Sequence, residues 1–379
     1  MKMRKIGIIG GGQLGKMMIL DGKRLDTQFA ILDPTEHCPA HSIADTHIVA
    51  GFDDVEAIVR LAQGVDVVTY EFEHISVEAL RRLEAEGHKV YPSSETLAHI
   101  QNKYVQKEWL RQHKISVPDF LPVENLTDIY AAEERFTYPM ILKTCTGGYD
   151  GKGNAVIGSH EDAARAYQAL GAGRLPLMVE ECIDFEKEVS ILACASENGQ
   201  LSVFPVAENV HQDSILDETT VPAKISPETA QEAMEVAKDC LKAFEACGML
   251  CIELFVTKEG HILVNELAPR PHNSGHYTIE ACYTSQYEQH VRAILGLPLG
   301  SPDLIRPAAM KNIIGDKKGT AELAGLEEAY TFPNAKIHIY GKETVSPGRK
   351  MGHITATGET VEEALAEARG AHEALSFLN

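Results

Sequence analysis

Hydrophobic and polar positions in the first hundred residues alternate between short apolar runs and segments with helical spacing. Apolar runs at 5–9, 28–32 and 66–70 predict buried strands, and the spacing up to about residue 20 and over 76–86 predicts two helices. Strands that alternate with helices are typical of a parallel, doubly wound sheet. The first part of the chain is therefore predicted to be an α/β domain.

The pattern changes in the middle third, where apolar runs follow one another with few helical segments between them. Strands are expected at 139–143, 155–157, 177–183 and 186–195. A long helix should begin at Ser226, with Pro227 in its first position, and Gly248 should end it. Thr360 and Glu363 have the spacing of a capping box for a last helix. The central part is expected to be α+β.

Two glutamates thirteen residues apart lie in runs that predict one hairpin, 251–256 and 262–267. A turn centred on Glu259 and Gly260 pairs residues whose numbers sum to 519, so Glu253 should lie opposite Glu266. Like charges there repel by roughly 3 kcal/mol at an effective dielectric of about 20, and a divalent cation would reverse the sign. Mg²⁺ takes one or two protein carboxylates plus phosphate oxygens, and Asn265 offers a further oxygen. The alternative is two solvated glutamates in a slipped or bulged register.

A glycine-rich turn separates the first strand from the first helix. Gly10, Gly12 and Gly15 spell G-x-G-x-x-G, and Asp33 ends the next strand. This is the dinucleotide-binding fingerprint, so an NAD-dependent oxidoreductase is an alternative function. The physical chemistry says only that a glycine-rich turn at a helix N-terminus favours a phosphate group, whichever molecule carries it.

A second glycine-rich loop runs from Gly147 to Gly153 between two expected strands. Glycines allow close approach of the backbone to a ligand, backbone N–H groups can contact phosphates, and Lys143 and Lys152 bring positive charge. A phosphate-binding flap is one interpretation, and a flexible hairpin tip is the other.

Length and composition favour a multi-domain enzyme. The chain has 379 residues, which is more than one ordinary hydrophobic core accommodates. Its net charge of −20 argues against a nucleic-acid or anionic-membrane surface. Its eight cysteines contain no C-x-x-C pair, which indicates neither a zinc site nor a disulfide framework, and no apolar run has the length of a membrane span. A cytoplasmic location is expected.

Several ordered motifs between residues 10 and 353 together point to one family. They are Gly10–Gly15, Tyr70–Glu73, Gly147–Gly153, Glu208–His211, Asn265–His276 and Gly348–His353. This order resembles the ATP-grasp ligases, and among them those that carboxylate 5-aminoimidazole ribonucleotide in purine biosynthesis. The chain departs from the family pattern at Ser346. An arginine is expected at this position, before Pro-Gly-Arg-Lys, and a serine would lose the contact of that arginine with a phosphate.

The resemblance implies a doubly wound N-terminal domain at 1–99, an ATP-grasp domain at 100–296 and a small β-rich domain at 297–379. It also implies that ATP phosphorylates bicarbonate to carboxyphosphate and that the exocyclic amine of aminoimidazole ribonucleotide is then carboxylated. Mg²⁺ held by Glu253 and Glu266 would accompany ATP, and the protein would be a homodimer. Another carboxylate–amine ligase of the same superfamily is the alternative.

The resemblance assigns the ATP site to residues of the central part. Adenine should lie along 180–183, the ribose hydroxyls at Glu188, and the phosphates at Lys103 and Lys143 under the flap. The full set of expected ATP-binding residues is Lys103, Lys143, Gly148, Tyr149, Asp150, Gly151, Lys152, Gly153, Asn154, Glu180, Glu181, Cys182, Ile183, Glu188, His211, Asn265 and Glu266. The alternative for His211 is that it makes an ordinary structural hydrogen bond and does not contact ATP.

The ribonucleotide, bicarbonate and carboxyphosphate are expected beside the phosphates of ATP. The residues assigned to them are Gln13, Leu14, Glu71, Glu73, Arg270, His272, Asn273, Ser274, Arg349 and Lys350. Glu71 and Glu73 stand at the carboxyl end of a parallel strand, where ligands of open α/β sheets usually bind. In the alternative they are ordinary loop carboxylates.

Proton transfer is expected from two residues far apart in the sequence, Asp150 on the flap and Lys350 in the C-terminal domain. Arg270 and Tyr149 complete the expected catalytic set. Arg270 is included because its planar guanidinium suits bicarbonate and carboxyphosphate. Each assignment has a structural alternative: Asp150 and Lys350 are surface residues that never meet, and Arg270 only neutralises the acidic hairpin.

Overall fold

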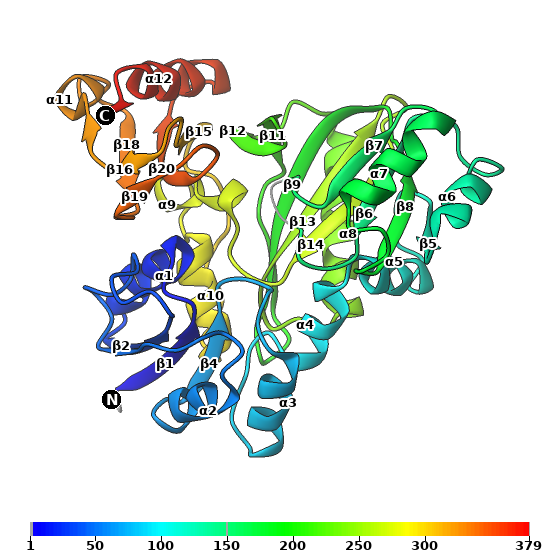
Figure 1. The fold of residues 1–379 in the computed structure, drawn as a ribbon. Coiled ribbons are helices and arrows are strands. Elements are labelled where there is room, and N and C mark those ends of the chain that lie inside the picture. Colours follow the sequence, from blue (N-terminus) through cyan, green and yellow to red (C-terminus); the bar gives the residue numbers. More distant parts are fainter. Residues whose placement is uncertain (1–2, 149–150, 379) are drawn as a thin grey trace.

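The computed structural model describes residues 3–148 and 151–378, which form three parts (Figure 1). The N-terminal part contains a parallel sheet in the order β3-β2-β1-β4. Its strands are β1 (Arg4–Ile9), β2 (Thr27–Leu32), β3 (Thr46–Ile48) and β4 (Val67–Tyr70), and its helices are α1 (Gln13–Lys23), α2 (Val55–Gln63), α3 (Val77–Ala85) and α4 (Ser94–Gln101). The α/β prediction is confirmed, although it missed the short β3 and the helices α2 and α4.

Both faces of this parallel sheet are covered. Helices α2 and α3 pack on one face, and α1 packs on the other. The second face is completed by α10 (Gln286–Ile294), whose Tyr287, Val291 and Ile294 join the same core as Met18 and Phe29. In Figure 1 the yellow α10 lies beside the blue α1 and β1. A helix from much later in the chain therefore fixes the N-terminal sheet to the rest of the molecule.

His290 of α10 links the parallel sheet to the largest sheet of the protein. The backbone N–H of Met249 donates to Nδ1 at 3.0 Å, and Nε2 lies 2.8 Å from Oγ1 of Thr69. Because Nδ1 accepts, Nε2 carries the proton of the neutral ring and donates to Thr69. His290 is fully buried, and burial lowers its pKa to about 3.

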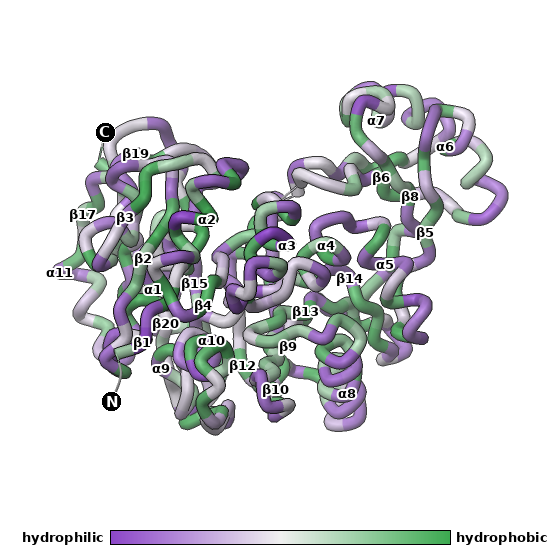
Figure 2. The backbone as a smooth tube through the Cα atoms, turned by 90° about the horizontal axis from the view of Figure 1, so that it is seen from below, coloured by the Kyte–Doolittle hydropathy of each residue, from purple (hydrophilic) through white to green (hydrophobic). Residues whose placement is uncertain are grey.

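A four-stranded antiparallel sheet forms a lobe of its own, at the upper right of Figure 2. It contains β5 (Phe120–Val123), β6 (Met140–Thr144), β7 (Asn154–Ile157) and β8 (Leu177–Glu181), in the order β5-β8-β6-β7, and carries α6 (Leu126–Ala132), η1 (His160–Asp162) and α7 (Ala163–Ala169). Met140, Leu142 and Val179 pack into the core under α6 and α7. Side chains alternate between the faces of a strand, so Lys143 and Glu180 lie on the other face.

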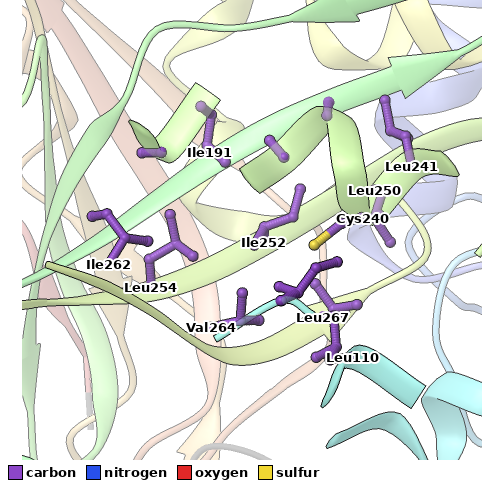
Figure 3. Close-up of a cluster of buried hydrophobic side chains, with 14 of the residues drawn as sticks. Leu110, Ile191, Cys240, Leu241, Leu250, Ile252, Leu254, Ile262, Val264 and Leu267 are labelled. Carbon is purple, nitrogen blue, oxygen red and sulfur yellow. The ribbon is translucent and has the colours of Figure 1, made fainter. Parts of the chain in front are cut away.

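The largest sheet has nine strands, and its centre carries the main hydrophobic core. The strands of its first part are β9 (Phe185–Ala195), β10 (Leu201–Val203), β11 (Ala207–Gln212), β12 (Ile215–Val221), β13 (Gly248–Thr257) and β14 (Ile262–Ala268). Helices α5 (Lys103–Gln112) and α8 (Pro227–Ala243) pack on one face, and η2 (Asn273–Gly275) and α9 (Thr278–Ala281) follow β14. Leu250, Ile252 and Leu254 of β13 point into the core (Figure 3), so Glu253 and Phe255 face the opposite side.

The C-terminal strands extend this same sheet. β15 (Ala308–Ile314) pairs with β12, followed by β20 (Lys350–Thr357) and β18 (Ala335–Ile339). Two short ladders pair β16 (Gly319–Thr320) with β19 (Thr344–Val345) and β17 (Leu323–Ala324) with β21 (Ser376–Phe377), and the helices are α11 (Leu326–Ala329) and α12 (Val361–Glu373). At the junction, the buried Glu218 of β12 contacts Lys311 at 3.1 Å and Arg369 at 2.7 Å. The predicted β-rich C-terminal part is therefore present, but it shares a continuous sheet with the central part.

Two local predictions need correction. Helix α8 begins after Ser226 as predicted but ends at Ala243, and Gly248, with φ of +100°, is the first residue of β13. Thr360 caps α12 by accepting from the N–H of Glu363, whose carboxylate accepts from Glu359 rather than from Thr360. No helix in the described ranges has both the length and the apolar sequence needed to cross a membrane.

Candidate active site

The three parts meet at a cavity of about 760 Å³, a volume typical of small-molecule sites. Its wall takes residues from the start of α1, the loop after β4, α5, the two large antiparallel sheets and the start of β20. The predicted residues that it contains are Gln13, Leu14, Glu71, Glu73, Lys103, Lys143, Gly148, Gly151, Asn154, Glu180, Glu181, Cys182, Ile183, Glu188, His211, Glu253, Asn265, Glu266, Arg270, His272, Asn273 and Lys350. Most of the residues predicted from the sequence therefore meet in one place.

The remaining predicted residues do not line this cavity or lie outside the described residues. Lys152 and Gly153 belong to the flap but not to the wall. Ser274 is buried, with its hydroxyl 2.9 Å from Oγ of Ser190 and 2.9 Å from Nδ1 of His272, so it orients a wall residue. Arg349 donates to the carbonyl and hydroxyl oxygens of Thr344 instead. Tyr149 and Asp150 lie outside the described residues.

Glu253 and Glu266 are cross-strand partners on β13 and β14, as the hairpin pattern predicts. The register between them and the turn is different from the prediction, because Leu254 pairs with Val264 and leaves Asn265 as an extra residue in β14. Such a β-bulge turns consecutive side chains away from strict alternation. Asn265 and Glu266 can therefore both line the cavity, which a regular strand would prevent.

Each carboxylate of this pair contacts a cation. Nζ of Lys103 forms an ion pair with Oε1 of Glu266, and Nε2 of His272 lies 3.1 Å from Oε1 of Glu253. Burial acts to raise the pKa of Glu253, but His272 and the other nearby cations lower it to about 2. Burial acts to lower the pKa of His272, but Cys251 and Glu253 raise it to about 10. Both partners are therefore charged at neutral pH.

The donor set at this hairpin fits magnesium. The Glu253 and Glu266 side chains are 30% and 43% exposed to the cavity, and Asn265 lies beside them. Across residues 3–148 and 151–378, no three His, Cys, Asp or Glu side chains are grouped as metal ligands. Mg²⁺ is commonly held by one or two carboxylates together with phosphate oxygens and water, and Glu253, Glu266 and Asn265 offer oxygens of this kind.

The flap lies against the β11–β12 turn. Thr144 N–H donates to the Gly153 carbonyl at 2.8 Å and closes the base of the loop. Gly151, at φ of +73°, packs so closely on the Ser214 side chain that a Cβ at this position would clash. A glycine is therefore required for the flap to reach across the cavity to the larger sheet.

Two charged contacts join predicted ligand-binding residues at this end of the cavity. Nδ1 of His211 lies 2.6 Å from Oε2 of Glu188. Burial acts to lower the pKa of His211, but Glu188 raises it overall. Nζ of Lys143 lies 2.6 Å from Oε2 of Glu180, whose side chain is only 2% exposed. His211 and Glu188 therefore act as a pair, which the sequence did not reveal.

Arg270 joins the central part to the N-terminal part rather than neutralising the hairpin. Its Nη2 lies 2.7 Å from Oε1 of Glu73, while its buried Nε has no hydrogen-bond partner among the described residues. Both amide atoms of the buried Asn273 are likewise without a partner there. Arg270 and Asn273 both line the cavity, but these three atoms are themselves buried, so the charged guanidinium is the group here that suits an anionic ligand.

The first glycine turn is occupied by carboxylates of the protein itself. Glu71 is buried and accepts from the N–H groups of Gly12 at 2.5 Å and Gly15 at 2.7 Å. Asp33, the acidic residue of the dinucleotide fingerprint, accepts from the N–H of Gly11 at 2.9 Å. These N–H groups do not face a pyrophosphate, which removes the physical basis of the oxidoreductase alternative.

Among the wall residues that sequence reasoning missed are two aromatic residues on neighbouring strands. Phe185 of β9 and Phe255 of β13 line the cavity beside Ile183, and their rings stack with centroids 4.8 Å apart. Phe255 is two residues after Glu253, so the alternation of β13 placed it on the cavity face. The signal for Phe255 was present in the strand pattern.

Comparison with known proteins agrees with this geometry. Residues 3–101 match the ribonucleotide synthetase preATP-grasp domain, residues 108–287 the ATP-grasp domain, and residues 308–367 the phosphoribosylaminoimidazole carboxylase C-terminal domain. The chain is 41% identical over 363 residues to the N5-carboxyaminoimidazole ribonucleotide synthase of Bacillus subtilis. This match covers 96% of this chain and 93% of that protein.

Solved structures show the same likeness. The N5-carboxyaminoimidazole ribonucleotide synthetase of Thermotoga maritima is 44% identical with a TM-score of 0.90, and each chain is covered to 100%. The Aspergillus clavatus synthase, in a complex with ADP and 5-aminoimidazole ribonucleotide, is 36% identical with a TM-score of 0.91 and 98% coverage of both chains.

The fold, the acidic hairpin with Lys103 and these matches define the protein as an ATP-grasp ligase, which confirms the class predicted from the motifs. Within that class, the chain belongs to the N5-carboxyaminoimidazole ribonucleotide synthase family.

Proposed function

We propose that this chain uses ATP and bicarbonate to carboxylate the exocyclic amine of 5-aminoimidazole ribonucleotide, a step of purine biosynthesis. Family membership supports the reaction, and the arrangement of the cavity supports the roles of the residues. The observation that carries these roles is the juxtaposition of Lys103, Lys143 and the acidic hairpin with Arg270, His272 and Lys350 in one cavity. The first group suits a nucleotide triphosphate, and the second suits a small anion beside it.

ATP would occupy the side of the cavity formed by the small sheet and β9. Its adenine is proposed to lie along 180–183 beside Phe185, and its ribose near the Glu188–His211 pair. Lys103 and Lys143 would leave their carboxylate partners and contact the phosphates under the flap. Phosphoryl transfer depends mostly on such positioning and charge stabilisation.

Mg²⁺ is proposed to bind at Glu253, Glu266 and the amide oxygen of Asn265, where it would neutralise phosphate charge. When the nucleotide is bound, Lys103 would exchange Glu266 for a phosphate oxygen. His272 would stay protonated beside Glu253 and present its positive charge to the anion that accepts the phosphoryl group.

Bicarbonate is proposed to lie between Arg270, His272 and Asn273, next to the phosphates. Transfer of the γ-phosphoryl group to a bicarbonate oxygen gives ADP and carboxyphosphate. The amine of the ribonucleotide then gains the carboxyl group while phosphate leaves and the amine loses a proton. Bidentate contact with a guanidinium suits both bicarbonate and carboxyphosphate.

The ribonucleotide would extend toward Gln13, Leu14 and Glu73 of the N-terminal part. Lys350 at the start of β20 lines the same cavity and is proposed to stabilise or protonate the departing phosphate. Asp150 is proposed to accept the proton of the amine, and Tyr149 to assist it, although both lie outside the described residues. Arg349 and Ser274 are proposed only as supports of this region.

The cellular location, the oligomeric state and the domain boundaries stay predictions. We propose that the protein is a cytoplasmic homodimer and that its divisions lie at about residues 99 and 296. A different carboxylate–amine ligase of the superfamily would share the nucleotide site, so the identity of the amine and of the acid is what needs testing.

Release of ADP should be measured with each substrate omitted in turn. Full activity should require ATP, bicarbonate and aminoimidazole ribonucleotide together, and formate should not replace bicarbonate. Equal ADP release without the ribonucleotide, or with formate instead of bicarbonate, would overturn the substrate assignment. An absorbance change with NAD(P)H would revive the oxidoreductase alternative.

A further inference from the structure

Helix α5 carries a second lysine one turn after Lys103. Residues four apart lie on the same helical face, so Lys107 points in the same direction as Lys103. The Lys107 side chain is 2% exposed, against 16% for Lys103, and it does not line the cavity. A lysine buried to this extent is rare and needs a partner.

The partner of Lys107 is Glu180, which it shares with Lys143. Nζ of Lys107 lies 2.9 Å from one carboxylate oxygen, and Nζ of Lys143 lies 2.6 Å from the other. Lys143 reaches Glu180 along the small sheet, because Glu180 pairs with Ile141 and Lys143 is the next residue on that face. Two ammonium groups from different parts of the structure therefore compete for one buried carboxylate.

The two contacts differ in position. Lys143 lies at ion-pair distance from the carboxylate and lines the cavity. Lys107 is at ion-pair distance, but neither its Nζ nor Oε1 of Glu180 makes a well-directed hydrogen bond within the described part of the chain. Lys107 thus holds unused donors next to an oxygen that can still accept them.

The charges of this triad do not cancel. With both lysines protonated, it carries one excess positive charge. Burial, together with the charge of Lys143, lowers the pKa of Lys107 to about 8 against the opposing effect of Glu180. Burial acts to raise the pKa of Glu180, but the two lysines lower it overall. Glu180 stays ionised, and one of its two cations is surplus in the absence of a ligand.

Departure of Lys143 would leave Glu180 as a buried, unpaired charge if no second cation were present, which is strongly unfavourable. We propose that Lys107 is a positioning residue of the ATP site, which holds Glu180 in place and neutralises it when Lys143 moves to the phosphates. This inference rests on the proposed assignment of Lys143 to the phosphates of ATP. Lys107 would then make nucleotide binding possible without touching the nucleotide.

Binding of the non-hydrolysable analogue AMP-PNP with Mg²⁺ should be measured by calorimetry. Lys107→Met keeps the length of the side chain but removes its charge, and we expect the Kd to rise about 10- to 100-fold, equivalent to roughly 1.4–2.7 kcal/mol. Lys107→Arg should stay within about threefold of the wild type. Lys238 of α8, a partly exposed lysine paired with Glu235, provides a matched control, and Lys238→Met should not change the Kd.

A double variant separates charge compensation from simple packing. The Glu180→Gln variant has an uncharged amide at this position, which needs no cation. In that background, Lys107→Met should raise the Kd by no more than about threefold. An undiminished effect of Lys107→Met in that background would show that Lys107 only fills space, and would overturn the inference.

Proton uptake gives a readout that a packing role cannot produce. Once Lys143 leaves, its repulsion is lost while the attraction of Glu180 and Glu266 remains, so the pKa of Lys107 should rise on binding. At pH 8.5, wild-type protein should take up a fraction of a proton with AMP-PNP, seen as a dependence of the binding enthalpy on the ionisation enthalpy of the buffer. Lys107→Arg, which cannot deprotonate, should bind well with a smaller uptake, and equal uptake in wild type and Lys107→Arg would contradict the inference.

Lys143→Met distinguishes this inference from the proposed function. If Lys143→Met leaves the Kd unchanged, the assignment of Lys143 to the phosphates fails and the inference fails with it. If Lys143→Met weakens binding while Lys107→Met does not, the phosphate site stands and only the role of Lys107 is wrong.

Discussion

Glu253 and Glu266 lie opposite each other across the β13–β14 hairpin, and each carboxylate contacts its own cation. Like charges at such a position repel, so Lys103 and His272 stabilise the pair in the ligand-free protein. The sequence pattern leads one to expect that removal of one charge would relieve repulsion and raise stability. The structure changes that expectation, because the removed charge also leaves Lys103 without its counter-ion.

Glu266→Gln should therefore lower turnover without stabilising the protein. The substitution keeps the size of the side chain but removes a charged oxygen that is proposed to hold Mg²⁺, and we expect kcat to fall by about 10²–10³. The free energy of unfolding in urea should stay the same or fall. Glu259→Gln in the exposed hairpin turn is the matched control. Near-normal activity at limiting Mg²⁺ would rule out the ligand assignment.

Lys350→Met and Asp150→Asn should each reduce kcat by about 10²–10⁴, the range of general acid–base assistance, with little change in ATP affinity. If the two residues act in one step, the double variant should lose much less than the product of the two single losses. Single-turnover measurements of carboxyl transfer would test this. Fully multiplicative losses, or full activity in either single variant, would show that the residues do not share a step.

Gly12→Val should raise the KM for the ribonucleotide far more than the KM for ATP. A Cβ at Gly12 would lie 2.7 Å from Oε1 of Glu71, so the valine displaces the carboxylate that orders the turn beside Gln13 and Leu14. Steady-state kinetics with each substrate varied separately would show the difference. A similar rise in both KM values would mean that the turn does not serve the ribonucleotide. NAD should not raise the melting temperature of the wild type.

The His290 link should make the protein sensitive to acid. The pKa of His290 is lowered from 6.5 to about 3, so between these values the unfolded state binds a proton that the folded state does not. Stability therefore falls as the pH drops from 6.5 toward 3, by up to about 1.4 kcal/mol per pH unit from this group.

His290→Gln isolates this contribution. The variant should be less stable than the wild type at pH 7.5, because a buried hydrogen-bonded ring is lost, but the difference should shrink at pH 5. Chemical unfolding at both pH values measures it, with Thr69→Val as a control that removes the hydroxyl partner and keeps the titrating ring. A difference that grows toward pH 5 would contradict the assignment of a neutral, buried imidazole.

The sequence predicted much of the fold and most of the cavity wall, for identifiable reasons. Strand alternation and turn residues placed Glu253 opposite Glu266, and the ordered motifs led to the family. A bulged register was one alternative, but its position at Asn265 could not be foreseen. The position depends on how β14 docks on α5 and on the loop at Ser116, whose carbonyl accepts from the N–H of Val264 at 2.8 Å.

Contacts between parts were harder to predict than residues within them. The Arg270–Glu73 ion pair and the closure of the N-terminal core by α10 join segments about 200 or more residues apart, and no local pattern encodes such docking. Lys107 shows the same limit: no pattern in the sequence singled it out, and only the tertiary structure shows that it is buried against Glu180.

The unbroken sheet from β14 to β18 has a mechanical consequence. It joins the acidic hairpin to the start of β20 through hydrogen-bonded ladders, so Glu266 and Lys350 belong to one stiff platform although they stand far apart in the sequence. Within residues 3–148 and 151–378, the small sheet that carries Lys143 forms no ladder with that platform, so it can shift relative to the platform without breaking a strand pairing. A chain cut near residue 300 would lose Lys350 and would also uncover the edge of β12, which favours aggregation over an independent domain.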